Sequence, residues 1–204
     1  GYVRLLLLVI AFGSLNWSPV FFLVAYTTSI ILDGLDGYTA RKFGQCSYFG
    51  AWFDVVQDNI SRGLLWAHLH PLLSLISALE WMTFTCTHTL GAEWRSTLIE
   101  KPPSVQKPPV VVAKVLQNNF RSLFGIWAIS GLHVLPIWLF GMQYEIFSQY
   151  LIFVPEFIPY LGVIILVSGR LLCGLCEAWC CWTHIQELLV NTTHVKCRVQ
   201  KVNN

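Results

Sequence analysis

The chain has 204 residues, of which 55% are hydrophobic and only 12% are charged, and its mean hydropathy is +0.57. Soluble domains carry about 25% charged residues, so half that share, together with nine Trp, excludes an ordinary water-soluble domain and indicates surroundings that are largely lipid. The net charge of +2 is too small to indicate a nucleic-acid partner.

The sequence predicts an all-α integral membrane protein with six transmembrane helices, since about 20 apolar residues are needed to cross a bilayer as a helix. Turns at 16–19 and 68–71 predict tight helical hairpins, and the Pro-rich stretch 99–109 predicts a loop. In chain order the predicted spans cover residues 1–15, 19–31 with a more polar continuation to 41, 49–69, 72–89, 123–140 and 157–185.

One transmembrane catalytic domain is expected over residues 1–190, followed by a basic cytoplasmic tail over 191–204. The chain starts with Gly1 and runs directly into an apolar segment, so we expect its N-terminus to be truncated. Cys173, Cys176 and Cys180 follow helical spacing in the sixth span. A zinc ribbon would need a second pair at a distance, so we interpret these thiols as buried hydrophobic side chains.

The basic residues predict how the chain is oriented in the membrane. The connections 13–20, 66–72 and 141–156 contain no Lys or Arg, whereas the connections on the other side contain nearly all of them. By the positive-inside rule the basic side is cytoplasmic, and an even number of spans then places both termini there. The basic side is marked by Arg41, Lys42, Arg95, Lys101, Lys107, Lys114, Arg121, Lys196, Arg198 and Lys201.

All four Asp of the chain fall between positions 33 and 58. Asp33 and Asp36 share a face at the end of the second helix, and Asp54 and Asp58 share a face of the third, because residues three or four apart are neighbours on a helix. Carboxylates inside a membrane span are costly unless they are paired, bind metal or face water. Two facing pairs suit two Mg²⁺ or Mn²⁺ ions, which prefer carboxylate and phosphate oxygens and can clamp the oxygens of a phosphoryl displacement.

Small residues beside the aspartates leave room for a bulky ligand. Gly34, Gly37 and Ala40 keep one helix face bare, and Arg41, one turn beyond Gly37, can fork onto a phosphate. Gly50 leaves space at the entrance of the third helix, and Ser47 offers a hydroxyl at the same edge. This pattern favours a ligand site over a solvated loop.

Other charged residues are candidates for the acceptor side of such a site. Arg62, one turn past Asp58, could balance the charge of that carboxylate or touch an acceptor. Glu80 in the fourth span and Glu177 in the sixth could bind an acceptor or form a bond between helices. Arg121 could hold an acceptor phosphate or a lipid head group, or extend to the interface.

The segment from Asp33 to Asp58 resembles the signature of the CDP-alcohol phosphotransferase family. The match consists of Asp33-Gly-Leu-Asp36-Gly37-Tyr-Thr-Ala40-Arg41, then eight residues to Gly50, three to Asp54 and three to Asp58. The resemblance implies a fold of six helices, a homodimer in the membrane, two divalent metal ions, and displacement of CMP from a CDP-linked lipid by an alcohol.

The same resemblance implies roles for individual residues. Asp33, Asp36 and Asp54 correspond to metal ligands, and Asp58 corresponds both to a residue near the second metal and to the general base. The positions that correspond to contacts with the CDP moiety are Gly37, Arg41 and Ser47.

Within the family, the chain resembles the eukaryotic phosphatidylinositol synthases. Gly1-Tyr2-Val3-Arg4 is similar to the start of their first helix, and Gln45–Ala51 to their run before the third aspartate. The chain departs from them at Gln57-Asp58-Asn59, where those enzymes usually have Thr-Asp-Arg, and in the fourth span. The half that binds CDP and metal is therefore matched, whereas the acceptor half has diverged.

The sequence supports the hypothesis of an enzyme of phospholipid synthesis, in the endoplasmic reticulum membrane with its site facing the cytoplasm. It would transfer a phosphatidyl group from CDP-diacylglycerol to a polyol, with inositol as the first candidate. Alternatives are another acceptor such as glycerol phosphate or serine, a relative that binds CDP-lipid and metal without turnover, and an ion or proton transporter. The last gives no reason for the bare Gly and Ala face beside Arg41.

Overall fold

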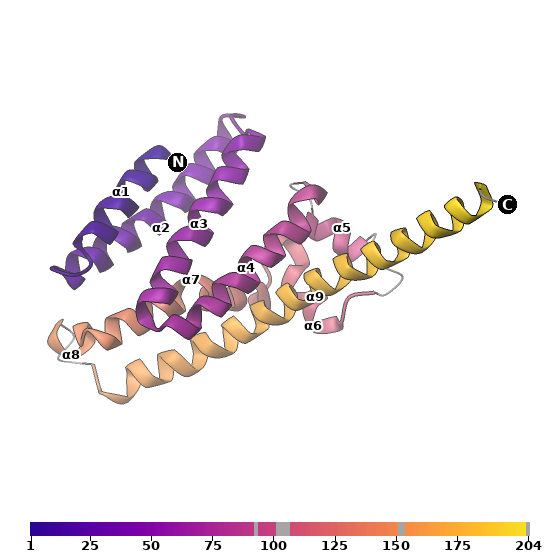
Figure 1. Ribbon diagram of the computed structural model, residues 1–204. Coiled ribbons are helices and arrows are strands. Elements are labelled where there is room, and N and C mark those ends of the chain that lie inside the picture. Colours follow the sequence, from indigo (N-terminus) through magenta and orange to yellow (C-terminus); the bar gives the residue numbers. More distant parts are fainter. Residues whose placement is uncertain (92–93, 101–106, 151–153, 203–204) are drawn as a thin grey trace. The chain divides into compact units, whose positions relative to one another are not determined.

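The computed structural model describes residues 1–91, 94–100, 107–150 and 154–202. This part of the chain is helical and contains no strand, which confirms the all-α prediction (Figure 1). The long helices are α1 (Tyr2–Ser14), α2 (Pro19–Lys42), α3 (Tyr48–Leu69), α4 (Ser74–Thr87), α7 (Leu123–Gln143) and α9 (Phe157–Val202). Shorter ones are α5 (Trp94–Glu100), α6 (Val110–Leu116), α8 (Ile146–Tyr150) and the 3₁₀ turns η1 (Pro71–Leu73), η2 (His88–Leu90) and η3 (Gln117–Phe120).

The six long helices lie where the six spans are predicted, but not all of them meet the requirements for crossing a bilayer. Three segments of the described chain are long and apolar enough, namely Pro19–Lys42, Leu123–Gln143 and Phe157–Val190. Helix α4 has 14 residues, which gives a length of about 21 Å against a hydrocarbon core of about 30 Å. The protein is therefore rich in membrane-compatible helices, and six crossings stay a prediction.

The structure corrects two predicted boundaries. Helix α9 does not end near residue 185 but continues to Val202, into the predicted tail. The predicted loop over 99–109 is helical at its start, because α5 ends only at Glu100. Residues 101–106 lie outside the described residues, and 107–109 are not helical. Proline prevents continuation of a helix but does not fix where the helix before it stops.

The chain divides into two compact units. The first consists of Gly1–Ser77 and His133–Ile165, and the second of Ala78–Leu132 and Leu166–Asn204. Helices α7 and α9 each contribute to both units. The predicted catalytic domain over 1–190 and the separate tail stay predictions.

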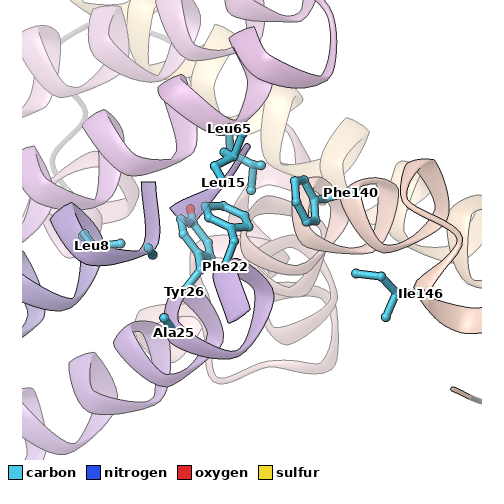
Figure 2. Packing of buried hydrophobic residues seen from close by; sticks show 9 residues of the cluster. Leu8, Leu15, Phe22, Ala25, Tyr26, Leu65, Phe140 and Ile146 are labelled. Carbon is cyan, nitrogen blue, oxygen red and sulfur yellow. The ribbon is translucent and has the colours of Figure 1, made fainter. Parts of the chain in front are cut away.

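The core of the first unit brings α1, α2, α3 and α7 together (Figure 2). Phe22 of α2 is fully buried, and the centroid of its ring lies 4.6 Å from that of Phe140 on α7 and 5.4 Å from that of Tyr26. Leu8 and Leu65 add aliphatic contacts from α1 and α3. Pro19 stands at the first position of α2, where the fixed φ of proline favours the start of a helix. This packing holds α1, α2 and α3 together.

The second unit packs Val112, Val115 and Leu116 of α6 against α7 and α9. Cys173 and Cys176 belong to this core, and Cys180 is also buried, which confirms their interpretation as buried side chains. Helices α7 and α9 touch backbone to backbone through glycines. A Cβ on Gly131 would lie 2.2 Å from the nitrogen of Arg170, and one on Gly169 would lie 2.5 Å from the carbonyl oxygen of Trp127. Small residues commonly allow such close crossings between membrane helices.

This crossing predicts that Gly131→Ala destabilises the protein. The added methyl group must push α7 and α9 apart, so we expect the free energy of unfolding to fall by about 1–3 kcal/mol. Thermal or denaturant unfolding in detergent micelles measures the change. The matched control is Gly13→Ala, whose Cβ would meet nothing within 4 Å and which should leave stability unchanged or slightly raised. Equal behaviour of the two variants would contradict the close crossing.

Candidate active site

The four aspartates lie on two consecutive helices that are joined by a tight turn. Asp33 and Asp36 are on α2, and Asp54 and Asp58 are on α3. Gly44 follows the C-cap of α2 with φ of +65°, and the nitrogen of Gln45 donates to the carbonyl of Ala40 at 2.9 Å. A left-handed glycine just past a helix end is the usual way to reverse the chain. The turn therefore returns α3 toward the aspartates of α2.

Arg4 of α1 is the centre of the carboxylate cluster. Its Nη1 forms ion pairs with Asp33 Oδ1 and Asp54 Oδ1, and its Nη2 donates to Asp58 Oδ1 at 2.7 Å. Its Nε donates to the carbonyl oxygen of Ser29 at 3.2 Å. The side chain is 2% exposed. One guanidinium group thus brings together carboxylates from two different helices.

Asp36 lies apart from that guanidinium group. Its side chain is 48% exposed, and its Oδ2 lies 2.6 Å from the nitrogen of Gly1. Of the four predicted ligands, the structure therefore gathers Asp33, Asp54 and Asp58 on Arg4, and leaves Asp36 at the more exposed end.

Asp58 has a second cationic neighbour. Arg62 Nη1 lies 3.5 Å from Asp58 Oδ2, while its Nη2 donates to Asn59 Oδ1 at 2.7 Å. His133 of α7 faces the same guanidinium group, with its Nδ1 3.4 Å from Arg62 Nη1. Arg62 and Asn59 are buried. The two oxygens of Asp58 are thus each directed toward a different arginine.

The predicted phosphate-binding residues lie at the exposed end of α2 and the start of α3. A Cβ on Gly37 would lie 3.2 Å from Arg41 Nη1, so the guanidinium group lies back along the bare face of the helix. Ser47 accepts a hydrogen bond from the nitrogen of Gly50 at 2.9 Å and caps α3. The space beside Gly50 is therefore taken by the Ser47 hydroxyl. Ala40 is half-buried near Arg41, which is exposed.

Three of the four candidate acceptor residues, Glu80, Arg121 and Glu177, belong to the second unit. Glu80 of α4 is buried with Arg170 of α9, whose Nη2 lies 3.4 Å from Glu80 Oε1 and whose Nη1 donates to Glu177 Oε2 at 2.8 Å. This geometry gives both glutamates a partner on a membrane helix. Arg121 is exposed where η3 ends. Arg62 is the candidate that the structure places against Asp58.

Sequence reasoning missed Arg4 and His133 as parts of the site. The signal for Arg4 was an arginine in the first turn of an apolar helix, because such a residue is costly unless it has a polar partner. His133 sits in an apolar span for which the sequence offers no partner nearby. In each case the partner comes from a distant segment.

The residues at the cluster fit a hard divalent cation by donor type and charge. Carboxylate oxygens are the ligands that Mg²⁺ and Mn²⁺ prefer, and the four formal negative charges exceed the two of Arg4 and Arg62. Asp33 Oδ1 is buried, and its contact is the ion pair with Arg4. Within the described residues, no three His, Cys, Asp or Glu side chains already form a metal-holding group. Binding would therefore require the carboxylates to rearrange around the ion.

The sequence of the chain matches a known protein family. The sequence profile described as CDP-alcohol phosphatidyltransferase matches residues 2–168, a span that includes α1, α2, α3 and both aspartate pairs. The chain belongs to this family. The resemblance seen in the aspartate motif is therefore confirmed over most of the chain.

Several relatives in the CDP-alcohol phosphatidyltransferase family carry names that specify inositol. A CDP-diacylglycerol–inositol 3-phosphatidyltransferase of Schizosaccharomyces pombe is 31% identical over 112 residues, 50% of this chain and 47% of that protein. A probable enzyme of the same name from Arabidopsis thaliana is 36% identical over 101 residues, 45% of each chain. The chain thus spans about half the length of these relatives.

One relative carries a different acceptor in its name. A CDP-diacylglycerol–serine O-phosphatidyltransferase of Methanocaldococcus jannaschii is 48% identical over 56 residues, 25% of this chain and 28% of that protein. No solved structure matches the chain. Membership of the CDP-alcohol phosphatidyltransferase family therefore stands on sequence, and the acceptor is a separate question.

The cap of α3 predicts the effect of Ser47→Ala. Loss of the hydroxyl that accepts from Gly50 should lower the free energy of unfolding by about 1 kcal/mol, because the first N–H groups of a helix lack internal partners. Ser47→Thr keeps a capping hydroxyl and is the control. Unfolding of both variants in detergent measures the difference, and a wild-type transition for Ser47→Ala would show that the cap contributes nothing.

Proposed function

We propose that this protein transfers the phosphatidyl group of CDP-diacylglycerol to a small polyol, with inositol as the acceptor, and releases CMP. The observation that carries the proposal is the convergence of Asp33, Asp54 and Asp58 near the end of α2 that carries Gly37 and the exposed Arg41. Family membership supplies the reaction class, and the names of the eukaryotic relatives favour inositol.

Asp33, Asp36, Asp54 and Asp58 would hold two divalent ions, Mg²⁺ or Mn²⁺. When bound, these ions supply positive charge against the diphosphate of the substrate. Arg41 adds a planar donor group from the same end of α2, suited to two phosphate oxygens at once. The exposed position of Arg41 leaves its donors available to a ligand.

Asp58 acts as the general base in this proposal. It takes the proton from the acceptor hydroxyl, the hydroxyl oxygen forms a bond to the phosphorus next to diacylglycerol, and the bond from that phosphorus to the bridging oxygen of CMP breaks. CMP leaves with the electron pair. Contacts from Arg4 to Oδ1 and from Arg62 to Oδ2 hold the carboxylate in place, and each oxygen keeps a further lone pair for the proton.

The acceptor side is assigned first to Arg62, because it adjoins Asp58. For Glu80 and Arg121, an acceptor role stays a prediction from the sequence alone. The charge bias supports a site that faces the cytoplasm, and the proposal places the protein in the endoplasmic reticulum membrane. A homodimer is proposed from the family resemblance.

The direct test is an acceptor screen with the purified chain, labelled CDP-diacylglycerol and Mg²⁺ or Mn²⁺. Inositol should yield a phosphatidyl product and an equal amount of CMP, while glycerol phosphate and serine should yield less. A product formed only with serine would identify serine as the acceptor, as in the name of the relative from Methanocaldococcus jannaschii. Stabilisation by CMP without any product would instead indicate a binding protein without turnover.

Asp58→Asn should lower the rate of product formation by about 10²–10⁴-fold, because loss of a general base has effects of this size. The amide keeps the shape of the side chain, so CMP should still raise the melting temperature of the variant. An Asp58→Asn protein that turns over at the wild-type rate would refute the assigned role. Loss of CMP-induced stabilisation would show that the role of Asp58 in holding the cation and the substrate accounts for the lost rate.

A pair of glycine variants on the bare face of α2 tests the space beside Arg41. A Cβ at position 37 would lie 3.2 Å from Arg41 Nη1, whereas a Cβ at position 34 would meet nothing within 4 Å. Gly37→Val should therefore weaken CMP-induced stabilisation by at least about tenfold in apparent affinity, the effect of losing roughly 1.4 kcal/mol of binding free energy. Gly34→Val introduces the same residue on the same helix and should retain near wild-type affinity. Equal losses in both variants would mean that helix propensity, and not the space beside Arg41, is responsible.

A further inference from the structure

Arg4 is a charged residue at a position where burying a charge has a high cost in free energy. It lies in the first turn of an apolar helix and is almost fully buried. A buried guanidinium group is tolerated only if its donors and its charge are matched. Arg4 meets this requirement entirely with the aspartate cluster and one backbone carbonyl.

The geometry of these contacts connects three helices. Nη1 reaches Asp33 of α2 and Asp54 of α3, Nη2 reaches Asp58 of α3, and Nε reaches the backbone of α2 at Ser29. A guanidinium group has donors spread over a rigid plane, so it can meet several acceptors at fixed angles, whereas the ammonium of Lys is a compact point charge. This arrangement therefore depends on the shape of the group as well as on its charge.

The exposed fractions show that Arg4 neutralises the cluster from its buried side. The Arg4 side chain is 2% exposed, whereas those of Asp33 and Asp54 are 30% and 46% exposed. The carboxylates thus keep accessible surface that the arginine does not cover, and this surface is open to a ligand or cation.

We propose that Arg4 is a positioning residue that acts as the resident counter-cation of the aspartate cluster. It holds Asp33, Asp54 and Asp58 together before a divalent cation and the substrate bind, and it makes folding of the cation-free chain possible. The identity of the arriving cation rests on the proposed function, whereas the counter-cation role rests on the contacts of Arg4. When Arg4 is removed, the carboxylates repel one another, and a divalent cation becomes the group that must neutralise them.

The test is thermal unfolding of the full chain in detergent micelles, in EDTA and again in MgCl₂ or MnCl₂. Arg4→Gln should lower the melting temperature in EDTA by at least about 6 °C, because removing one partner of a buried ion pair is strongly destabilising. The divalent cation should restore more than half of that loss and should stabilise the variant more than it stabilises the wild type. A role of Arg4 in packing alone would not create this dependence on the cation.

Two further variants complete the design. Lys42→Gln removes one positive charge from the exposed end of the same α2 and should leave both the melting temperature and the cation-induced shift unchanged. Arg4→Lys keeps the charge but not the planar fork, so its loss in EDTA should lie between those of wild type and Arg4→Gln. If Arg4→Gln does not yield folded protein, Arg4→Lys carries the comparison and must show a larger cation-induced shift than the wild type.

A double variant tests the repulsion itself. Asp54→Asn added to Arg4→Gln removes one carboxylate from the uncompensated cluster, so the double variant should be more stable in EDTA than Arg4→Gln alone. The proposal is overturned if Arg4→Gln melts like the wild type in EDTA, or if its loss is the same with and without the cation. It is equally overturned if Asp54→Asn further destabilises Arg4→Gln. Because the readout is melting temperature, these outcomes are independent of whether the chain forms any phosphatidyl product.

Discussion

The first unit depends on the neutralisation of carboxylates that lie on apolar helices. Asp33, Asp54 and Asp58 would repel one another at close range, and Arg4 meets all three of them. This interaction determines where α1 can lie, because a buried arginine cannot move away from its acceptors without a large desolvation penalty. The aromatic core around Phe22 and Phe140 then packs the same helices from their apolar sides.

Neutralisation of the carboxylates also bears on function. In a site for a charged ligand, the charges of the carboxylates must be neutralised while the carboxylates stay accessible. The cluster satisfies both conditions because its cation comes from the buried side and its carboxylates are partly exposed. Asp58 is the most enclosed of the four, with 22% exposure and an arginine near each oxygen. In the proposed reaction this fixed carboxylate would accept the proton at a defined point, and the more exposed Asp36 and Asp54 would meet a ligand that arrives from outside.

In the second unit, charges on apolar helices are also neutralised, but by a different set of residues. Arg170 lies between Glu80 and Glu177, so charges that would be costly in membrane helices are paired with each other. Close contact between α7 and α9 at Gly131 and Gly169 holds the backbone that carries Arg170. The two glutamates illustrate a general ambiguity in sequence: an acidic residue in a span indicates a polar partner, but that partner can be another residue of the same protein as well as a ligand.

Sequence by itself determined the helical nature of the chain, its family and the sharing of helix faces by the aspartates. These properties depend on local periodicity and on a motif confined to residues 33–58, so they can be read without knowing the fold. The tertiary structure alone decided what the motif contacts. Arg4 is 50 residues from Asp54, His133 is 71 residues from Arg62, and Glu80 is 90 residues from Arg170. Periodicity shows which face of a helix a side chain occupies. Which helix lies opposite that face depends on how all the helices pack together, and no local sequence pattern specifies that packing.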